Sequence, residues 1–217
     1  MGTEQVVFLH GLGAGPDSWD AELAALPDGF AGLAPRISGL SDDGAGLFTF
    51  ATAAAEVVDG LDRRGIVRAH LCGLSIGAML ALWTALEYPE RVASLVLSGG
   101  QVRPPTTALA VQTTIFRALP GRLVVPGGMD KHRFLAALEE VARVDFRGRL
   151  PEVGVAALVM CGSWDVVNLP AARTMAAGLP RAQLRIVPGG WHELNVGRPA
   201  DFAAALHEFY RGPAAPA

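Results

Sequence analysis

Short apolar runs alternate with helical segments along most of the chain, and this alternation constrains the fold more than any other sequence feature. The apolar runs lie at residues 6–9, 30–35, 70–72, 92–98, 157–161 and 183–187. Helical patterns lie at residues 49–64, between Gly77 and Pro89, and at residues 170–179 and 199–210. Continuous apolar runs of this length, separated by helices, are typical of parallel strands buried on both faces. The sequence therefore predicts an α/β fold with a mostly parallel sheet of about six strands and helices on both faces.

Residues 101–150 break this alternation. They contain two helical patterns, at residues 107–119 and 131–144, and no convincing strand. Helices inserted above the carboxyl edge of a parallel sheet commonly form a lid over the site at that edge. We therefore predict a single domain over residues 1–217, in which residues 101–150 are a helical lid insertion.

The lid segment has an unusual charge balance. It carries eight basic and four acidic residues, although the whole chain has a net charge of −3. A basic patch beside a cleft raises the local concentration of anionic ligands. We therefore expect a preference for anionic substrates if at least one arginine of the lid faces inward. The candidates are Arg103, Arg117, Arg133 and Arg147.

Composition excludes several other classes of protein. With 51% hydrophobic and 18% charged residues, the chain is neither disordered nor fibrous. Its slightly negative charge gives no reason to expect a nucleic-acid partner. Cys72 and Cys161 cannot form a disulfide framework, and no cysteine–histidine cluster has zinc-ligand spacing. Because no signal peptide and no apolar run of the ~20 residues needed for a membrane span are visible, we expect a cytoplasmic protein without a membrane partner.

The segment Gly73-Leu74-Ser75-Ile76-Gly77 has the pattern G-x-S-x-G between a predicted strand and a predicted helix. A serine on such a sharp turn has a strained backbone and needs glycine on both sides to avoid clashes. The turn lifts the hydroxyl clear of the sheet, and the helix N-terminus favours the negative charge that forms beside it. We therefore predict that Ser75 is a nucleophile, the alternative being an ordinary glycine-rich turn.

A serine hydroxyl needs a base and an orienting carboxylate to act as a nucleophile. Asp165 follows the apolar run at 157–161, and His192 follows the run at 183–187. Both side chains would emerge at the same carboxyl edge of the sheet as Ser75. The chain order Ser, Asp, His is the order of a nucleophile-elbow triad. We predict Ser75, Asp165 and His192 as the catalytic residues.

The reaction also requires donors for a developing oxyanion. The backbone N–H groups of Leu12, in the loop after the first strand, and of Ile76, at the helix N-terminus, are the predicted pair. The predicted substrate contacts are Gly11, Leu74, Trp164 and Trp191, each of which precedes one of the predicted oxyanion or catalytic residues. No cofactor or metal is needed for this chemistry.

Four segments in order give the chain a resemblance to the α/β-hydrolase fold family: His10-Gly11-Leu12-Gly13, Cys72-Gly73-Leu74-Ser75-Ile76-Gly77, Gly162-Ser163-Trp164-Asp165 and Gly190-Trp191-His192. Within that family the Ser75 segment is similar to that of 3-oxoadipate enol-lactonases and their esterase relatives. The resemblance implies hydrolysis of a small ester or lactone through an acyl-serine intermediate, without a cofactor.

The family topology has further implications. It separates the strands of Cys72 and Cys161 by another strand, so both should be free thiols. Family members usually open with an antiparallel strand pair, but only five residues precede Val6, which implies a trimmed sheet. The lid is short for an enol-lactonase, and Trp191 replaces the glycine that often precedes the histidine.

Other readings explain less of the sequence. Gly11, Gly13 and Gly15 suggest a dinucleotide loop, but Pro16 occupies the third glycine position of G-x-G-x-x-G. An NADP site using Arg36 would leave the predicted triad unexplained. His192-Glu193 begins the zinc-protease pattern H-E-x-x-H, but Val196 replaces its second histidine. A thioesterase or C–C hydrolase using the same triad, and a ligand-binding receptor or scaffold of the same fold, remain as alternatives.

Overall fold

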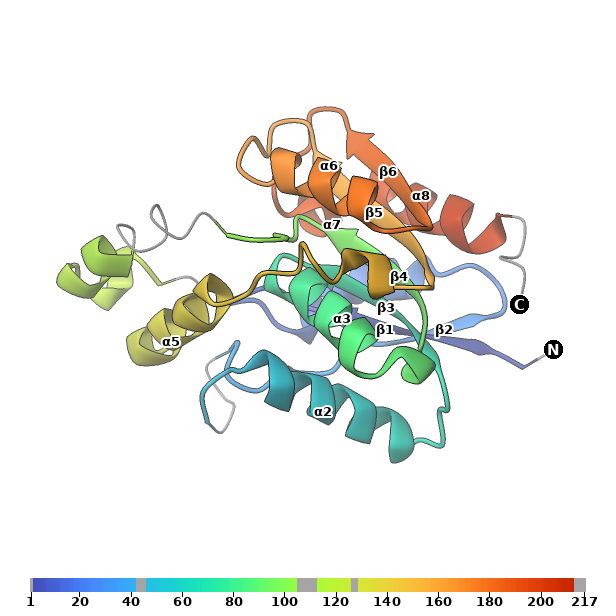
Figure 1. The fold of residues 1–217 in the computed structure, drawn as a ribbon, viewed down its shortest axis with the longest axis horizontal. Helices are drawn as coiled ribbons and strands as arrows, with labels where there is room; N and C mark the ends of the chain where they lie inside the picture. Colours follow the sequence, from blue (N-terminus) through green and yellow to red (C-terminus); the bar gives the residue numbers. More distant parts are fainter. Residues whose placement is uncertain (1, 42–45, 105–112, 126–128, 213–217) are drawn as a thin grey trace.

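The computed structural model describes residues 2–41, 46–104, 113–125 and 129–212. A six-stranded sheet with the strand order β2-β1-β3-β4-β5-β6 forms its centre, and every pairing is parallel (Figure 1). The strands are β1 (Glu4–Leu9), β2 (Phe30–Leu33), β3 (Ala69–Leu74), β4 (Val92–Ser98), β5 (Ala156–Gly162) and β6 (Ala182–Val187). The predicted six-stranded parallel sheet is confirmed.

Helices separate the strands. The α-helices are α1 (Asp20–Ala24), α2 (Phe50–Asp62), α3 (Ile76–Glu87), α5 (Lys131–Ala142), α6 (Leu169–Gly178), α7 (Leu194–Gly197) and α8 (Pro199–Arg211). Short 3-10 turns are η1 (Pro16–Trp19), η2 (Pro89–Arg91), η3 (Gly121–Leu123) and η5 (Leu150–Glu152). Since α2, α3 and α6 cover one face of the sheet and α1 and α8 cover the other, helices lie on both faces, as predicted (Figure 1).

Two hydrophobic clusters hold these layers together. Alternate residues of one strand enter opposite clusters, because successive side chains of a strand point to opposite faces of the sheet. In β1, Val7 packs with α2 and α3, whereas Phe8 packs with Trp19 and Phe202 on the other face. The rings of Phe8 and Trp19 are 5.1 Å apart, centre to centre. The strands are therefore apolar throughout because both faces are covered.

Cys72 and Cys161 are buried free thiols, as expected. They lie on β3 and β5, which β4 separates. Burial raises the pKa of both thiols above the ordinary value.

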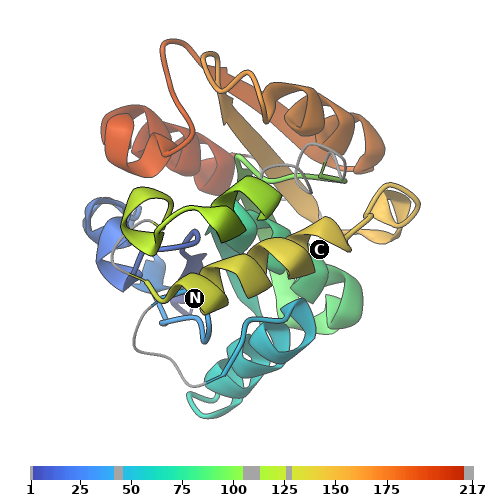
Figure 2. The same cartoon turned by 90° about the vertical axis from the view of Figure 1, so that its left-hand side faces the viewer.

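The lid segment, residues 101–150, has no strand in its described part. Residues 113–118 are helical, which agrees with the C-terminal half of the helix predicted at 107–119, whereas residues 107–112 lie outside the described ranges. The second predicted helix is α5, whose N-terminus is capped by Asp130. Figure 2 shows α5 crossing in front of the carboxyl ends of the central strands. The lid helices thus lie on the side of the sheet where the predicted site residues emerge.

Glu22, on α1, is a buried acid without a partner. Its side chain is fully buried, and neither carboxylate oxygen has a hydrogen-bond partner in the described structure. Burial disfavours the charged form and raises the pKa of Glu22 from 4.5 to about 7. The stability associated with the protonated Glu22 carboxyl is fully present below about pH 4.5 and is lost as the pH rises through 7. The reason is that between these two values the carboxyl is ionised in the unfolded chain but not in the folded protein.

We expect Glu22→Gln to remove this pH dependence. Between pH 5 and pH 8.5 the free energy of unfolding of the parent protein should fall by about 3 kcal/mol more than that of the variant. Urea unfolding at both pH values measures the difference, with Glu90→Gln on the surface turn η2 as the matched control. Parallel pH profiles for the parent and Glu22→Gln would show that Glu22 does not ionise in this range.

Candidate active site

Ser75 lies at the turn between β3 and α3. Its backbone has φ 57° and ψ −119°, and it is the one non-glycine residue in the described ranges with a positive φ. Two glycines make this turn sterically feasible. A Cβ at Gly73 would lie 2.2 Å from the Gly77 carbonyl oxygen, and a Cβ at Gly77 would lie 2.1 Å from the Leu9 carbonyl oxygen. The strained strand-to-helix turn that the G-x-S-x-G pattern predicts is therefore present.

Asp165 and His192 follow β5 and β6, the last two strands of the sheet. Asp165 lies three residues after β5 and His192 five residues after β6. The Asp165 Oδ2 atom is 2.8 Å from His192 Nδ1. The Asp165 side chain is 6% exposed, whereas that of His192 is 41% exposed. The carboxylate is thus buried behind a ring that reaches solvent.

The turn after β4 connects this pair to Ser75. The Ser75 N–H donates to the Ser98 carbonyl oxygen at 2.8 Å, and Gly99 follows directly. A Cβ at Gly99 would lie 3.0 Å from both Cε1 and Nδ1 of His192. The imidazole therefore packs on the Gly99 backbone, one residue from the carbonyl that anchors the serine. The structure brings the three predicted residues to the carboxyl end of one parallel sheet, after β3, β5 and β6.

Asn168 is a component of the site that the sequence patterns did not reveal. Its side-chain nitrogen lies 2.8 Å from each carboxylate oxygen of Asp165 and 3.1 Å from His192 Nδ1. The Gln101 amide nitrogen donates to Asn168 Oδ1 at 2.5 Å, which orients the asparagine amide with its nitrogen toward the carboxylate. The available signal was the N-cap position of Asn168, followed by proline in the first turn of α6.

The predicted oxyanion donors lie on the two segments that flank Ser75. A Cβ at Gly11 would lie 3.7 Å from both Ser75 Cβ and the Leu74 carbonyl oxygen, so the loop after β1 contacts the serine turn. The Gly13 N–H holds this loop by donating to the Leu40 carbonyl oxygen at 2.9 Å. Among the described residues the N–H groups of Leu12 and Ile76 have no backbone acceptor. Neither N–H is therefore engaged by the backbone of the described residues.

The four predicted substrate contacts differ in exposure. Gly11 and Leu74 are buried beside the serine turn. Trp164 and Trp191 are 54% and 66% exposed, and their rings contact each other edge to face at 5.5 Å. The tryptophans thus form an apolar surface on the loops that carry Asp165 and His192.

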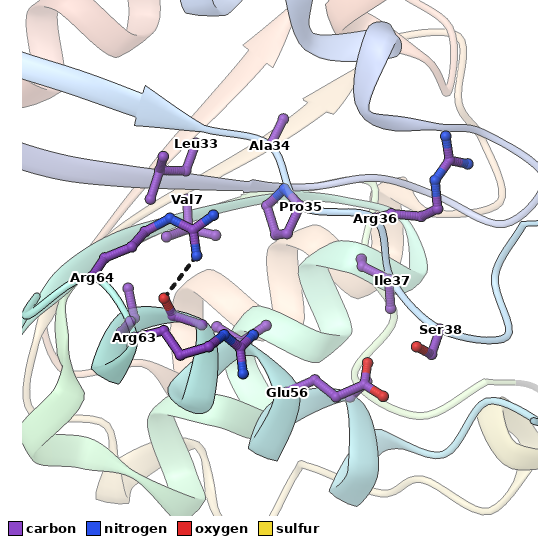
Figure 3. Close-up of a pocket in the computed structure, with 14 residues that line it drawn as sticks. Val7, Leu33, Ala34, Pro35, Arg36, Ile37, Ser38, Glu56, Arg63 and Arg64 are labelled. Atoms are coloured by element: carbon purple, nitrogen blue, oxygen red, sulfur yellow. Dashed lines mark hydrogen bonds between the residues drawn. The ribbon is translucent and has the colours of Figure 1, made fainter. Parts of the chain in front are cut away.

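A cavity of about 510 Å³ lies away from this site. It lies between α2 and the segment from β2 to Ser38, and neither Ser75 nor His192 lines it (Figure 3). Arg64 extends over it and donates to the Gly60 carbonyl oxygen at 2.9 Å. The cavity lies beside the edge of the sheet, where β2 pairs with β1 alone.

Two features of the described residues bear on other functions. These residues contain no group of three or more histidine, cysteine, aspartate or glutamate side chains placed to hold a metal ion. None of their helices is long and apolar enough to cross a membrane.

The parallel sheet, the serine turn and the Asp–His pair define a hydrolase-like arrangement, and comparison with known proteins identifies the family. A family model described as alpha/beta hydrolase fold matches residues 5–124. The chain therefore belongs to the α/β-hydrolase fold family, as the sequence resemblance predicted.

Several relatives are hydrolases by name. The chain is 26% identical over 243 residues to carbamate hydrolase RutD from Klebsiella pneumoniae, which covers 95% of this chain and 91% of that protein. It is 38% identical over 128 residues to the 2-hydroxy-6-oxononadienedioate/2-hydroxy-6-oxononatrienedioate hydrolase from Paraburkholderia phymatum, covering 55% of this chain and 44% of that protein. The enol-lactonase structure from Burkholderia xenovorans LB400 superposes with a TM-score of 0.81 at 23% identity, covering 97% of this chain and 92% of that one. Family and relatives together indicate hydrolase activity.

Proposed function

We propose that this protein is a serine hydrolase that cleaves a small ester or lactone through an acyl-serine intermediate. The observation that carries the proposal is the strained Ser75 turn next to the hydrogen-bonded pair of Asp165 and His192. Strain of this kind is maintained at functional sites because it aims a side chain at a substrate.

In the proposed reaction Ser75 is the nucleophile, His192 is the general base and acid, and Asp165 orients His192. His192 Nδ1–H donates to Asp165, which leaves Nε2 free to accept the Ser75 hydroxyl proton as the oxygen attacks the substrate carbonyl. The imidazolium then protonates the departing alcohol oxygen. In the second half-reaction His192 takes a proton from water, whose oxygen attacks the acyl carbon. The imidazolium then returns this proton to Ser75 Oγ as the bond between the acyl carbon and Oγ breaks, which releases the acid and restores the serine.

A substrate panel tests the proposed bond specificity. The purified protein should hydrolyse short-chain 4-nitrophenyl esters and small lactones with greater kcat/KM than acyl thioesters of the same chain length. Greater efficiency on thioesters would assign the protein to the thioesterase alternative. Binding of these compounds without turnover would favour the receptor alternative instead.

The oxyanion assignment gives a prediction at Leu12. Leu12→Pro removes the backbone N–H, and loss of one such donor costs about 10²- to 10³-fold in kcat. Leu12→Ala keeps the N–H and should change kcat by less than about threefold, since only a pocket wall is altered. Steady-state kinetics on one ester, with circular dichroism to check folding, compares the two. Equal kcat values for both variants would contradict the role of the Leu12 N–H.

A further inference from the structure

The charged side chains of the lid segment mostly satisfy one another. Its four acids are all engaged by neighbouring groups, and most of its cations have partners. Asp145 lies 3.6 Å from Arg103 and 2.7 Å from Arg147, Arg117 pairs with Glu139, Arg143 lies 3.5 Å from Glu140, Arg149 lies 2.6 Å from Glu87, and Lys131 donates to the Arg117 and Leu119 carbonyls. The exceptions within the described lid are Arg122, which is exposed, and Arg133.

Arg133 is the one cation of the described lid that has a shielded nitrogen without a partner. Its Nη1 atom is shielded from solvent and has no hydrogen-bond partner in the described structure. A guanidinium is always charged, and each of its N–H groups needs an acceptor. A buried donor without an acceptor is costly, which makes such an atom a candidate for binding a ligand.

The acid nearest in sequence, Asp130, does not pair with the Arg133 guanidinium. The Asp130 carboxylate accepts from the Arg133 backbone N–H at 3.1 Å, where it caps α5. This cap holds the first turn of the helix and leaves the Arg133 side chain unpaired.

Helix geometry places Arg133 on the inner face of the lid. Positions 133, 137 and 140 have the spacing of a single helix face. Ala137 is fully buried in the core, and Glu140 Oε1 accepts from the Phe50 N–H at 3.2 Å. That face is therefore turned toward the body of the domain. The helix α5 itself crosses the carboxyl edge of the sheet, which is the edge from which Ser75 emerges (Figure 2).

We propose that Arg133 binds a carboxylate on the substrate, so that the protein prefers esters or lactones that carry a second, anionic group. This inference rests on the proposed ester hydrolysis and narrows its substrate class. The planar guanidinium matches a carboxylate in a two-point contact, and shielding from solvent strengthens the pairing. The other lid arginines are paired with acids, except Arg122, whose side chain is exposed to solvent.

Matched substrates and variants test the proposal. Monomethyl glutarate carries the carboxylate and dimethyl glutarate does not. Arg133→Met should reduce kcat/KM for monomethyl glutarate by about 10- to 100-fold and change that for dimethyl glutarate by less than about twofold. Arg122→Met removes an exposed lid cation and should leave both values unchanged. The preference should persist in 0.5 M NaCl, which screens exposed charges but not a shielded contact.

Equilibrium binding separates this inference from the proposed hydrolysis. Glutarate binding is measured by titration calorimetry for the parent protein and for Arg133→Met. The affinity of the variant for glutarate should be at least about 10-fold weaker. Arg133→Lys, which keeps the charge but loses the fork, should fall between them and provides a second variant if Arg133→Met fails to fold. If no ester is hydrolysed but glutarate binding depends on Arg133, the hydrolysis proposal fails and the carboxylate site stands. Glutarate binding that is equal in all three proteins, or equally weakened by Arg122→Met, would overturn the inference.

Discussion

Replacing Ser75 with alanine is expected to reduce ester turnover by about 10⁴- to 10⁶-fold, because it removes the atom that forms the acyl intermediate. The substitution keeps the Cβ and should therefore leave the strained backbone of the turn in place. His192→Ala should cause a loss of similar size, since the serine then has no base. The double variant should be no worse than either single variant, because residues that act as a unit are strongly non-additive.

Initial rates on a 4-nitrophenyl ester measure these losses. Ser38→Ala, on the wall of the distant cavity, is the matched serine control and should retain full activity. Circular dichroism and thermal melting show whether each variant is folded. A folded Ser75→Ala protein with more than about a tenth of the parent rate would mean that hydrolysis does not proceed through Ser75.

Gly77→Ala is expected to destabilise the protein by at least about 3 kcal/mol, because the space for a methyl group is occupied by backbone. The added Cβ would lie 2.1 Å from the Leu9 carbonyl oxygen and 2.7 Å from the His10 carbonyl oxygen. Neither atom can move without disturbing the end of β1, an interior strand that pairs with β2 and β3. Urea unfolding measures the free energy of unfolding directly.

Gly148→Ala is the control for this prediction. A Cβ at Gly148 has no atom within 4 Å, and this glycine does not have a positive φ. The control should therefore lie within about 0.5 kcal/mol of the parent protein. A Gly77→Ala variant as stable as Gly148→Ala would contradict the close packing of α3 against β1.

Much of the fold was predictable because its signals are local. Each strand is a continuous apolar run, since both of its faces are covered, and glycines mark the turns where the strands end. The serine turn was predictable for the same reason. Gly73 is required by its close contact with Gly77, four residues later, and Gly77 is required by its close contact with the end of the adjoining strand β1. Asp165 and His192 were predictable because parallel strands end at one edge of the sheet.

Other features depend on contacts that no local pattern encodes. Asn168 was predictable as a helix N-cap, but its contact with His192 joins loops that are 24 residues apart. Gln101 approaches Asn168 across 67 residues. Among the lid cations, the sequence could name Arg133 as one of four candidates, but burial of its Nη1 atom depends on how α5 lies over the sheet.

The burial of the Glu22 carboxyl likewise depends on tertiary contacts that no local pattern encodes. Its position in a short helix with two acids predicts a solvated side chain, yet the side chain is fully buried in the folded domain, where α1 contacts α8. Tertiary packing thus overrides the local preference for exposure at this residue.

Covalent labelling tests the central claim most directly. The protein is incubated with a fluorophosphonate, the intact mass is recorded, and the modified peptide is sequenced by mass spectrometry. We expect one adduct per chain, located on Ser75, no adduct on Ser75→Ala, and strongly slowed labelling of His192→Ala because its serine is not activated. Labelling of Ser75→Ala at the parent rate, or an adduct on a different residue of the parent protein, would contradict the assignment of Ser75 as the nucleophile.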